Sequence, residues 1–254
     1  MSRTSQRLEP VTEIDHRAAA ARFFNQPGGH QGLNPYQQLY RQLHRIHGPQ
    51  GWWPLLRKSG ARIACRYHPD DYRYPKTSRQ RFEIGVGAIL TQNTNWGNVE
   101  KALINLATHS LLDARAILNA NPEHLKKLIR PAGYFNQKTT KLRLFAESYT
   151  AWKGTIPHRD TLLGIWGIGP ETCDSILLYA YQVPVFVIDA YTKRIFKHLG
   201  LSSETDYETL RRSCEQALPR EPALYQEYHA LLVAHAKRYY SKKPYGKNCP
   251  LQLS

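Results

Sequence analysis

The sequence predicts an all-α fold. No segment alternates apolar and polar residues with the period of two that marks a half-buried strand. Apolar residues instead recur at helical spacing, as in the segment 36–46, and short connections link many such segments. The chain contains no repeat of the kind that builds solenoids. These observations favour helices packed around a common core.

Capping residues and prolines divide the chain into helices. Asn121-Pro122 pairs an N-cap with a proline at the first helical position, and Thr94 or Asn95 can cap another helix. Asp113 and Asp160 begin two short helices. Longer ones are predicted over 36–46, 82–90, 96–107, 136–152, 190–199, 207–218 and 222–240. The basic, Tyr-rich passage up to residue 79 is expected to be an irregular connection, and residues 1–31 a loosely ordered arm.

The segment 166–189, WGIGPETCDSILLYAYQVPVFVID, carries the most specific pattern in the chain. Gly167-Ile168-Gly169 predicts a tight turn between helices, because glycine adopts positive φ angles at little cost. Such a turn lets backbone amides approach a phosphate, with a helix N-terminus just behind them. Pro170 suits the first turn of that helix. The apolar run that follows delivers a single carboxylate, Asp189.

The chain is strongly basic. Its 35 Lys and Arg against 20 Asp and Glu give a net charge of +15. This excess favours a polyanionic partner, either nucleic acid or an anionic membrane surface, although charge can also serve solubility alone.

No membrane-spanning helix is expected. The longest apolar run, 176–188, is 13 residues long and contains Gln182 and Pro184, whereas a spanning helix needs about 20 apolar residues. The N-terminus lacks the apolar core of a signal peptide, so we expect a cytoplasmic or otherwise intracellular location.

The four cysteines, Cys65, Cys173, Cys214 and Cys249, are scattered without CxxC spacing. This pattern argues against a zinc site, an iron–sulfur cluster with local ligands and a disulfide framework. It predicts reduced thiols.

Two motifs together resemble the helix-hairpin-helix signature of the endonuclease III superfamily of DNA glycosylases. They are GIGPET at 167–172 and VIDAYTKRIF at 187–196, and Glu171 and Asp189 are 18 positions apart, as the family spaces its hairpin residue and its catalytic aspartate. The resemblance implies two helical lobes with a DNA cleft between them. One would be a six-helix lobe over 75–185 that ends in the hairpin, and the other would combine 32–74 with 186–254.

Asp189 has two compatible interpretations. Aspartate routinely caps helices, and Asp189 directly precedes the predicted helix 190–199. The resemblance implies that it is also the catalytic carboxylate. A fixed negative charge stabilises a positive sugar as the glycosidic bond breaks, and it can orient or deprotonate the attacking water.

Two departures from the family pattern carry information. Glu171 stands where lyase members have a lysine that forms a Schiff base, and a carboxylate cannot form that adduct. Otherwise Glu171 is a first-turn residue favoured by the helix dipole. The segment 235–251, HAKRYYSKKPYGKNCPL, resembles the family's C-terminal iron–sulfur cluster loop. The resemblance puts Tyr239, Gly246 and Cys249 at the first three ligand positions, and one thiolate cannot hold a four-iron cluster. We therefore expect no lyase activity, no iron–sulfur cluster and no metal, although the hairpin can hold a structural monovalent cation through its carbonyls.

These departures occur together in the 3-methyladenine DNA glycosylase branch of the superfamily. The segments WWP (52–54), FEIGVGAILTQNT (82–94) and RPAGYFNQK (130–138) also resemble that branch. The resemblance implies that Trp52, Trp53 and Phe82 clamp the damaged base, which suits cationic methylated purines because aromatic faces attract cations. The alternative is that these aromatic residues belong to the core.

Base removal requires a flipped nucleotide, and something must fill the gap that it leaves. By family position, Gln92 inserts into the gap and Tyr134 wedges from the opposite lobe. Gln92 could instead simply end a helix, and Tyr134 could make a capping contact. Lys138 and the hairpin residues Gly167, Ile168 and Gly169 are expected to contact phosphates, although Lys138 equally suits a solvated basic face.

The sequence thus favours a monofunctional, monomeric glycosylase that removes alkylated purines, chiefly 3-methyladenine, from damaged duplex DNA. A non-catalytic helix-hairpin-helix DNA-binding protein is the alternative from another class, but it has no use for the aspartate or the aromatic set. A bifunctional glycosylase/lyase for oxidised pyrimidines is disfavoured by Glu171 and the missing cysteines.

Overall fold

Side-chain caps set most helix boundaries where the sequence predicted them. In the computed structural model, which describes residues 32–253, Asn34 Oδ1 accepts a hydrogen bond from Gln37 N (3.0 Å) and begins α2 (Pro35–His47). Asn95, Asp113 and Asn121 cap the next helices in the same way. The arm expected over 1–31 lies outside the described residues.

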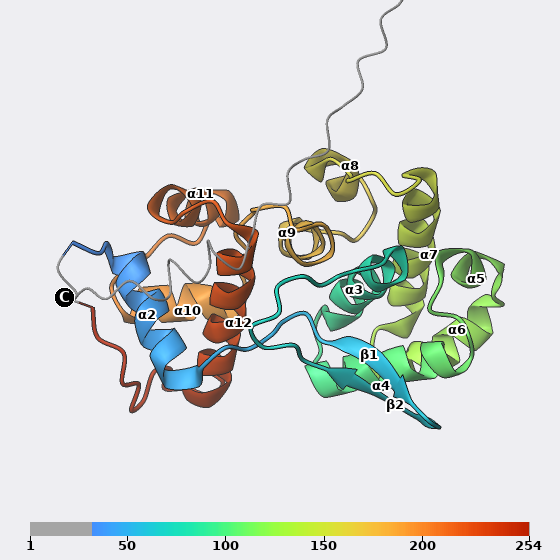
Figure 1. Cartoon of the computed structure of the whole chain (residues 1–254), viewed down its shortest axis with the longest axis horizontal. Coiled ribbons are helices and arrows are strands. Elements are labelled where there is room, and N and C mark those ends of the chain that lie inside the picture. Colours follow the sequence, from blue (N-terminus) through green and yellow to red (C-terminus); the bar gives the residue numbers. More distant parts are fainter. Residues whose placement is uncertain (1–31, 254) are drawn as a thin grey trace, which may run out of the picture.

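The remaining elements follow the predicted order (Figure 1). They are α3 (Ser78–Thr91), α4 (Trp96–Thr108), α5 (Ala114–Asn119), α6 (Pro122–Ile129), the 3₁₀ turn η1 (Arg130–Ala132), α7 (Phe135–Ala151), α8 (Arg159–Leu163), α9 (Pro170–Ser175), the π-helical turn η2 (Ile176–Ala180), α10 (Ala190–His198), α11 (Tyr207–Ala217) and α12 (Pro222–Tyr239).

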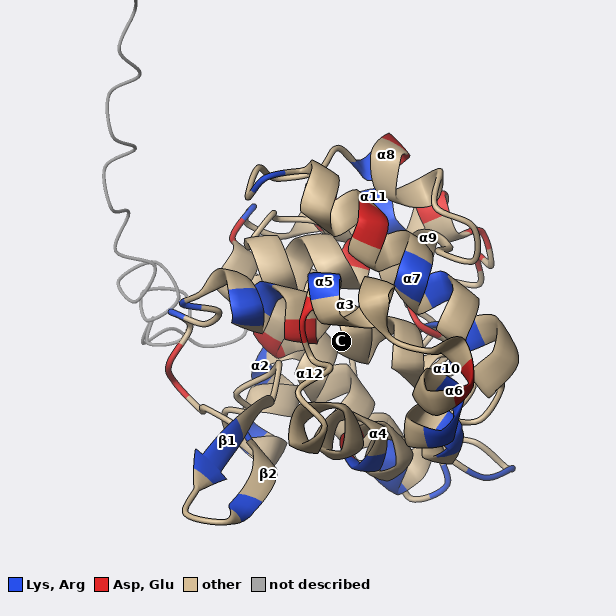
Figure 2. Ribbon diagram, turned by 90° about the vertical axis from the view of Figure 1, so that its right-hand side faces the viewer, with Lys and Arg blue, Asp and Glu red and all other residues tan. Residues whose placement is uncertain are grey.

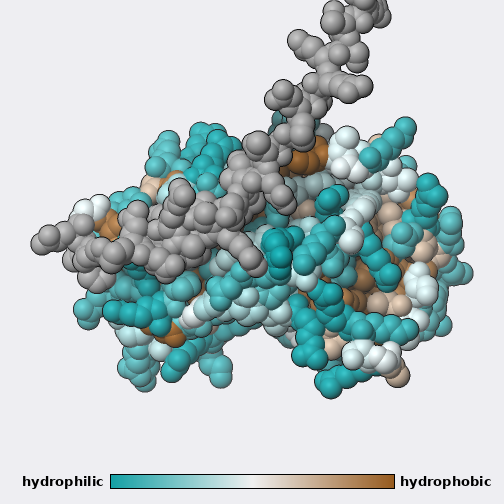
Figure 3. All heavy atoms as spheres, in the orientation of Figure 1, coloured by the Kyte–Doolittle hydropathy of each residue, from teal (hydrophilic) through white to brown (hydrophobic). Residues whose placement is uncertain are grey.

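The helices form two groups that sit side by side (Figure 1). In one group, α2 and α10 pack against the long helix α12. In the other, α3 is central and packs against α4, α7 and η2. The molecular surface is hollowed between the two groups at the lower edge of Figure 3. None of the described helices combines the length and the apolarity needed to cross a membrane.

The passage expected to be irregular contains an antiparallel hairpin, so that prediction was wrong. Strands β1 (Leu55–Ser59) and β2 (Arg62–Arg66) pair in register around Gly60-Ala61, where Gly60 has φ +58°. The strands are only five residues long and largely exposed, so they show no alternation that a sequence pattern could reveal. The hairpin packs on α3 and α4, which places it with the second group of helices although α2 belongs to the first.

The nearly continuous burial of α3 follows from its apolar sequence and its two glycines. Residues 82–90 are all buried. At Gly85 a Cβ would overlap the Phe145 ring of α7, so the absence of a side chain allows the two helices to approach closely. This contact fixes α3, whose C-terminal end lies beside the candidate site.

A buried carboxyl group makes stability depend on pH. Glu227 is 1% exposed and accepts a hydrogen bond from Gln50 N (2.6 Å), and burial raises its pKa to about 7. Because the pKa of Glu227 is higher in the folded than in the unfolded state, its contribution to the free energy of unfolding is complete below the unfolded-state pKa. That contribution is lost as the pH rises through the folded-state pKa of about 7. Between about pH 5 and pH 8 the free energy of unfolding is expected to fall by about 1–3 kcal/mol less in Glu227→Gln than in the wild type. Urea unfolding measures it, with the exposed Glu147→Gln as control. An unchanged pH slope would contradict the assignment.

Candidate active site

Asp189 begins α10 at the junction between the two groups of helices. Its Oδ1 accepts hydrogen bonds from the backbone amide (2.7 Å) and the hydroxyl (2.8 Å) of Thr192. The capping interpretation of Asp189 is therefore confirmed. Its Oδ2 lies 3.8 Å from Nε2 of His229, which is beyond hydrogen-bond distance. Of the Asp189 side chain 12% remains accessible, so one carboxylate oxygen is held in place without being sealed in the core.

The surroundings of Asp189 keep it ionised. Burial alone would raise its pKa, but the neighbouring His229 and the two hydrogen bonds from Thr192 outweigh that effect, so the pKa lies below its ordinary value. A fixed, negatively charged group that remains partly accessible can stabilise positive charge that develops beside it.

Aromatic side chains from two other segments lie beside His229. The rings of Trp52 and Tyr179 lie 5.9 Å from the His229 ring, and Trp52 lies 6.4 Å from Tyr179. Trp52 belongs to the segment before β1, Tyr179 to η2 and His229 to α12. The structure therefore brings Trp52 to the same cluster as Asp189, as a base-binding role requires.

The two adjacent tryptophans differ in their exposure. Trp53 is 6% exposed, its ring lies 5.4 Å from Trp96, and its Nε1 packs against α3 at Gly87. Trp52 is half-buried, and Nζ of Lys237 lies 5.8 Å from its ring centroid. Trp52 is thus the better placed of the two to offer a ring face, and Trp53 supports the cluster from the core through Tyr179 (5.2 Å).

Phe82 is not part of this cluster. It is 2% exposed, and its aromatic neighbours are Phe145 (5.7 Å, stacked) and Tyr149 (5.0 Å). It lies near the start of α3, within the contact between α3 and α7. This placement corresponds to the core interpretation that the sequence left open, so Phe82 is not carried further as a base-binding residue.

Glu171 lies in the first turn of α9. Its side chain is in contact with solvent, yet it sits among enough protein atoms that desolvation, together with the negative charge of Asp189, raises its pKa to about 7. The residue at the hairpin and the carboxylate 18 positions later are therefore electrostatically coupled.

The predicted hairpin joins α8 to α9. Gly167 has φ +82°, and Ile168 N donates to Ile165 O (3.0 Å), which closes the turn. The Ile168 side chain is 4% exposed and anchors the turn in the core, so only its backbone can face a ligand. Within residues 32–253, the amides of Gly167 and Gly169 donate to no protein acceptor. These free amides suit a phosphate oxygen.

Gln92 ends α3 and is tied to the hairpin. Its Nε2 donates to Gly167 O (3.0 Å) and Thr172 Oγ1 (2.9 Å), and its Oε1 accepts from Lys141 Nζ (2.6 Å). The next residue, Asn93, is exposed and has φ +54°. Tyr134, at the start of α7, is 63% exposed in a left-handed conformation (φ +47°). Tyr134 is thus free to wedge into DNA, whereas Gln92 must first release its partners.

The expected phosphate contact from Lys138 is wrong for this structure. The residue is 2% exposed, and its Nζ donates to Leu90 O (2.7 Å) and Ala132 O (2.8 Å). Burial, assisted by Lys141, lowers the pKa of Lys138 to about 8. Lys138 therefore ties the end of α3 to η1, because both elements leave backbone carbonyls without helical partners.

Basic side chains gather on several elements around the site. Figure 2 shows Lys and Arg on α6, on α7 and on the β1–β2 hairpin. Helix α10 carries Lys193, Arg194 and Lys197. This positive charge suits the phosphate backbone of a nucleic acid.

The C-terminal loop does not fit an iron–sulfur cluster. Gly246 N donates to Tyr239 O (2.9 Å), and the Cys249 sulfur lies 3.2 Å from His235 Nε2 and 3.3 Å from Tyr240 Oη. Within the described part of the chain, no three His, Cys, Asp or Glu side chains are grouped to hold a metal ion. One sulfur in a hydrogen-bonded setting cannot supply the four ligands that such a cluster needs.

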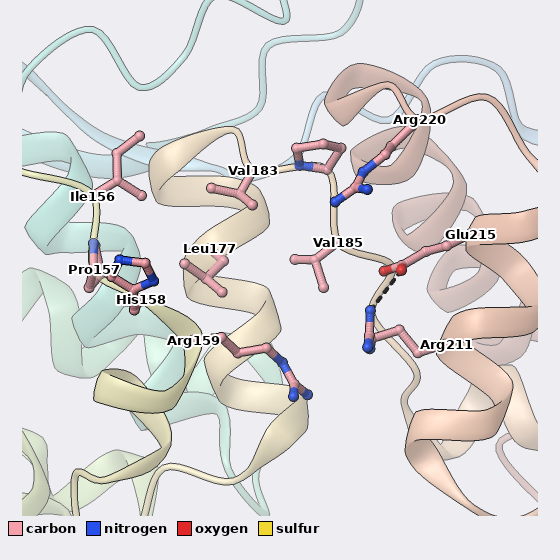
Figure 4. Close-up of a pocket in the computed structure, with 11 residues that line it drawn as sticks. Ile156, Pro157, His158, Arg159, Leu177, Val183, Val185, Arg211, Glu215 and Arg220 are labelled. Atoms are coloured by element: carbon pink, nitrogen blue, oxygen red, sulfur yellow. Dashed lines mark hydrogen bonds and ion pairs between the residues drawn. The ribbon is translucent and has the colours of Figure 1, made fainter.

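A separate cavity of about 410 Å³ lies beyond α8 and η2 (Figure 4). Leu177, Val183 and Val185 form an apolar wall, and the Arg211–Glu215 ion pair (2.7 Å) lies at its edge. Asp189 and the aromatic cluster do not line it. We assign the cavity no part in the site.

Sequence reasoning missed Tyr179, His229 and Lys237 as site residues. Tyr179 and His229 sit in apolar helical segments that are 50 positions apart. One signal was available, because a histidine next to the apolar run ALLVA of α12 must find a polar partner when buried.

Comparison with known proteins identifies relatives of much of the chain. A family model described as HhH-GPD superfamily base excision DNA repair protein matches residues 86–220. A Methanocaldococcus jannaschii protein named as a DNA repair glycosylase is 40% identical over 85% of this chain and 93% of its own length. Endonuclease III of Thermotoga maritima is 26% identical over 59% of this chain and 71% of its own.

Solved structures share the fold. The 3-methyladenine DNA glycosylase of H. pylori, bound to 1,N6-ethenoadenine, has a TM-score of 0.64 at 23% identity and covers 81% of this chain and 98% of its own. A non-covalent endonuclease III–DNA complex has a TM-score of 0.67 at 16% identity, with coverage of 86% and 94%. At these identities the likeness establishes the helical fold alone.

Proposed function

This chain belongs to the HhH-GPD superfamily of base excision DNA repair proteins and is a DNA repair glycosylase, and we propose that it is a monofunctional one that hydrolyses the glycosidic bond of alkylated purines, chiefly 3-methyladenine, in duplex DNA. The observation that carries this proposal is the position of Asp189. Its ionised carboxylate begins α10 within the cluster formed by Trp52 and His229. We propose that the protein acts as a monomer.

The chemistry follows from the charge of the substrate. A purine methylated at N3 or N7 is a cation, so it departs as a neutral base and needs no general acid. Its positive ring is attracted to the face of Trp52 by about 0.5–2 kcal/mol more than a neutral base. Lys237 lies over the same ring, and like charges repel, so we expect its ammonium group to move aside as the base enters. Asp189 then stabilises the sugar cation and activates water.

Glu171 supports the monofunctional assignment. A Schiff base requires an amine, and the hairpin position near Asp189 presents a carboxyl group. The absence of an iron–sulfur cluster and the monovalent cation at the hairpin remain predictions of the sequence.

DNA binding is assigned to the exposed groups beside the hairpin. The free amides of Gly167 and Gly169 suit a phosphate, and the exposed Tyr134 suits a wedge that keeps the duplex open. Asn93, adjacent to Gln92, is the exposed side chain best placed to enter the vacated space.

Base release from methylated duplex DNA tests the proposal. Mass spectrometry of the freed base is expected to show 3-methyladenine as the main product. Trp52→Ala should reduce release about tenfold or more, because it removes the ring face, while affinity for undamaged DNA changes little. Trp152→Ala removes a tryptophan outside the cluster and is the matched control. Equal losses in both variants, or release of a different base class, would contradict the assignment.

A further inference from the structure

A hydrogen-bonded pair of buried side chains, Tyr179 and His229, lies next to Asp189. Tyr179 Oη is 2.8 Å from His229 Nδ1, and His229 Nε2 is 3.8 Å from Asp189 Oδ2. His229 is 6% exposed and Tyr179 1%. On the basis of the proposed hydrolysis, we infer that His229 is a positioning residue that accepts, through Asp189, the proton released by the attacking water.

Tyr179 lets His229 exist in both charge states. The Tyr179 hydroxyl also lies 3.1 Å from the backbone oxygen of Gln226, to which it donates. With its hydrogen directed at Gln226, Tyr179 Oη accepts from Nδ1–H of His229, and Nε2 presents a lone pair to Asp189. The same arrangement serves the imidazolium, which donates from Nδ1 to Tyr179 and from Nε2 to Asp189.

The electron pair and the proton can each be followed through the reaction. The water oxygen forms a bond to the anomeric carbon as the bond to the base breaks, and the electron pair of that bond leaves with the base. The water proton passes to Oδ2 of Asp189 and then to Nε2 of His229, which restores the carboxylate. Closing the 3.8 Å separation by about 1 Å brings the two atoms to hydrogen-bond distance. The imidazolium returns the proton to solvent as the product leaves.

Other titratable groups lie around Tyr179 and His229. They come from α9, α10 and α12 and are Glu171, Asp189, Lys193, Glu227 and Lys237. When His229 is protonated before the reaction it cannot accept the proton, so it contributes an acidic limb to the pH profile.

Variants of His229 test the inference through the rate. In single-turnover release of 3-methyladenine, His229→Gln is expected to lower the rate about tenfold to hundredfold and to remove the acidic limb that His229 contributes. Binding to an abasic-site analogue is expected to stay within about twofold, because His229 acts through Asp189. A rate and an acidic limb equal to those of the wild type would overturn the inference.

Tyr179→Phe provides a second test that moves the pH profile in a stated direction. Without the hydroxyl, the imidazolium loses its acceptor at Nδ1, so protonation of His229 is disfavoured and the acidic limb should shift to lower pH. A shift to higher pH, or no shift, would overturn the inference even if His229→Gln fails to fold. Wild-type protein that releases no base at any pH would overturn the proposed function, and the inference with it. If the wild type releases base and both variants keep its rate and pH profile, the inference alone is overturned.

Discussion

Asp189→Asn is expected to lower single-turnover base release by about 10²–10⁴-fold. The substitution keeps the shape of the side chain and an oxygen that can accept from Thr192, so the N-cap of α10 is retained. It removes the negative charge that stabilises the sugar cation, and it leaves no group to deprotonate water. Affinity for DNA that contains an abasic-site analogue should be retained or rise, because a carboxylate near the phosphates is lost. Quenched-flow release assays and titration of the analogue measure the two effects.

The chain supplies a matched control for this substitution. Asp206 caps α11 with the same pattern, since its Oδ2 accepts from the amide (2.8 Å) and hydroxyl (2.9 Å) of Thr209. Asp206→Asn should therefore change the cap as Asp189→Asn does and leave base release unaltered. Comparable losses in both variants would mean that Asp189 matters only for the helix.

Glu171→Lys is expected to convert the enzyme into a glycosylase/lyase. An amine at the first turn of α9 would face the same sugar as Asp189, and partial burial would favour its neutral, nucleophilic form. With methylated duplex and borohydride, the variant should yield a covalent protein–DNA adduct, and without borohydride it should cut the strand. The wild type should yield neither.

Glu147→Lys is the control for Glu171→Lys, because it makes the same change of charge on the exposed face of α7. No adduct is expected from it. An adduct with the wild type or with Glu147→Lys would show that another lysine performs the chemistry, and the monofunctional assignment would fall.

Local signals allowed most of the helical fold to be predicted. Asp113 and Asn121 accept hydrogen bonds from backbone amides of the first helical turn, so a pattern within four residues was enough to locate these ends. The hairpin at Gly167 was likewise encoded locally, since its positive φ needs glycine. Strands β1 and β2 were not predicted, because their stability comes from packing on α3 and α4 rather than from their own sequence pattern.

The direction in which a side chain points was much harder to predict. Phe82 lies on α3 and Lys138 on α7, and the packing of these two helices against each other turns both side chains inward. Asp189 could be placed because the motif fixes its distance from the hairpin. Its partner His229 comes from α12, forty positions later, and the two meet only when the helix groups assemble. The carboxylate was therefore predictable and its surroundings were not.

One reaction tests the central claim most directly: a duplex with a single 3-methyladenine, followed in one time course for free base by mass spectrometry and for strand breakage by electrophoresis without alkali. A fixed carboxylate with no hairpin amine predicts that 3-methyladenine appears while the strand stays intact until alkali is added. Breakage in step with base release, or no free base at all, would contradict the account.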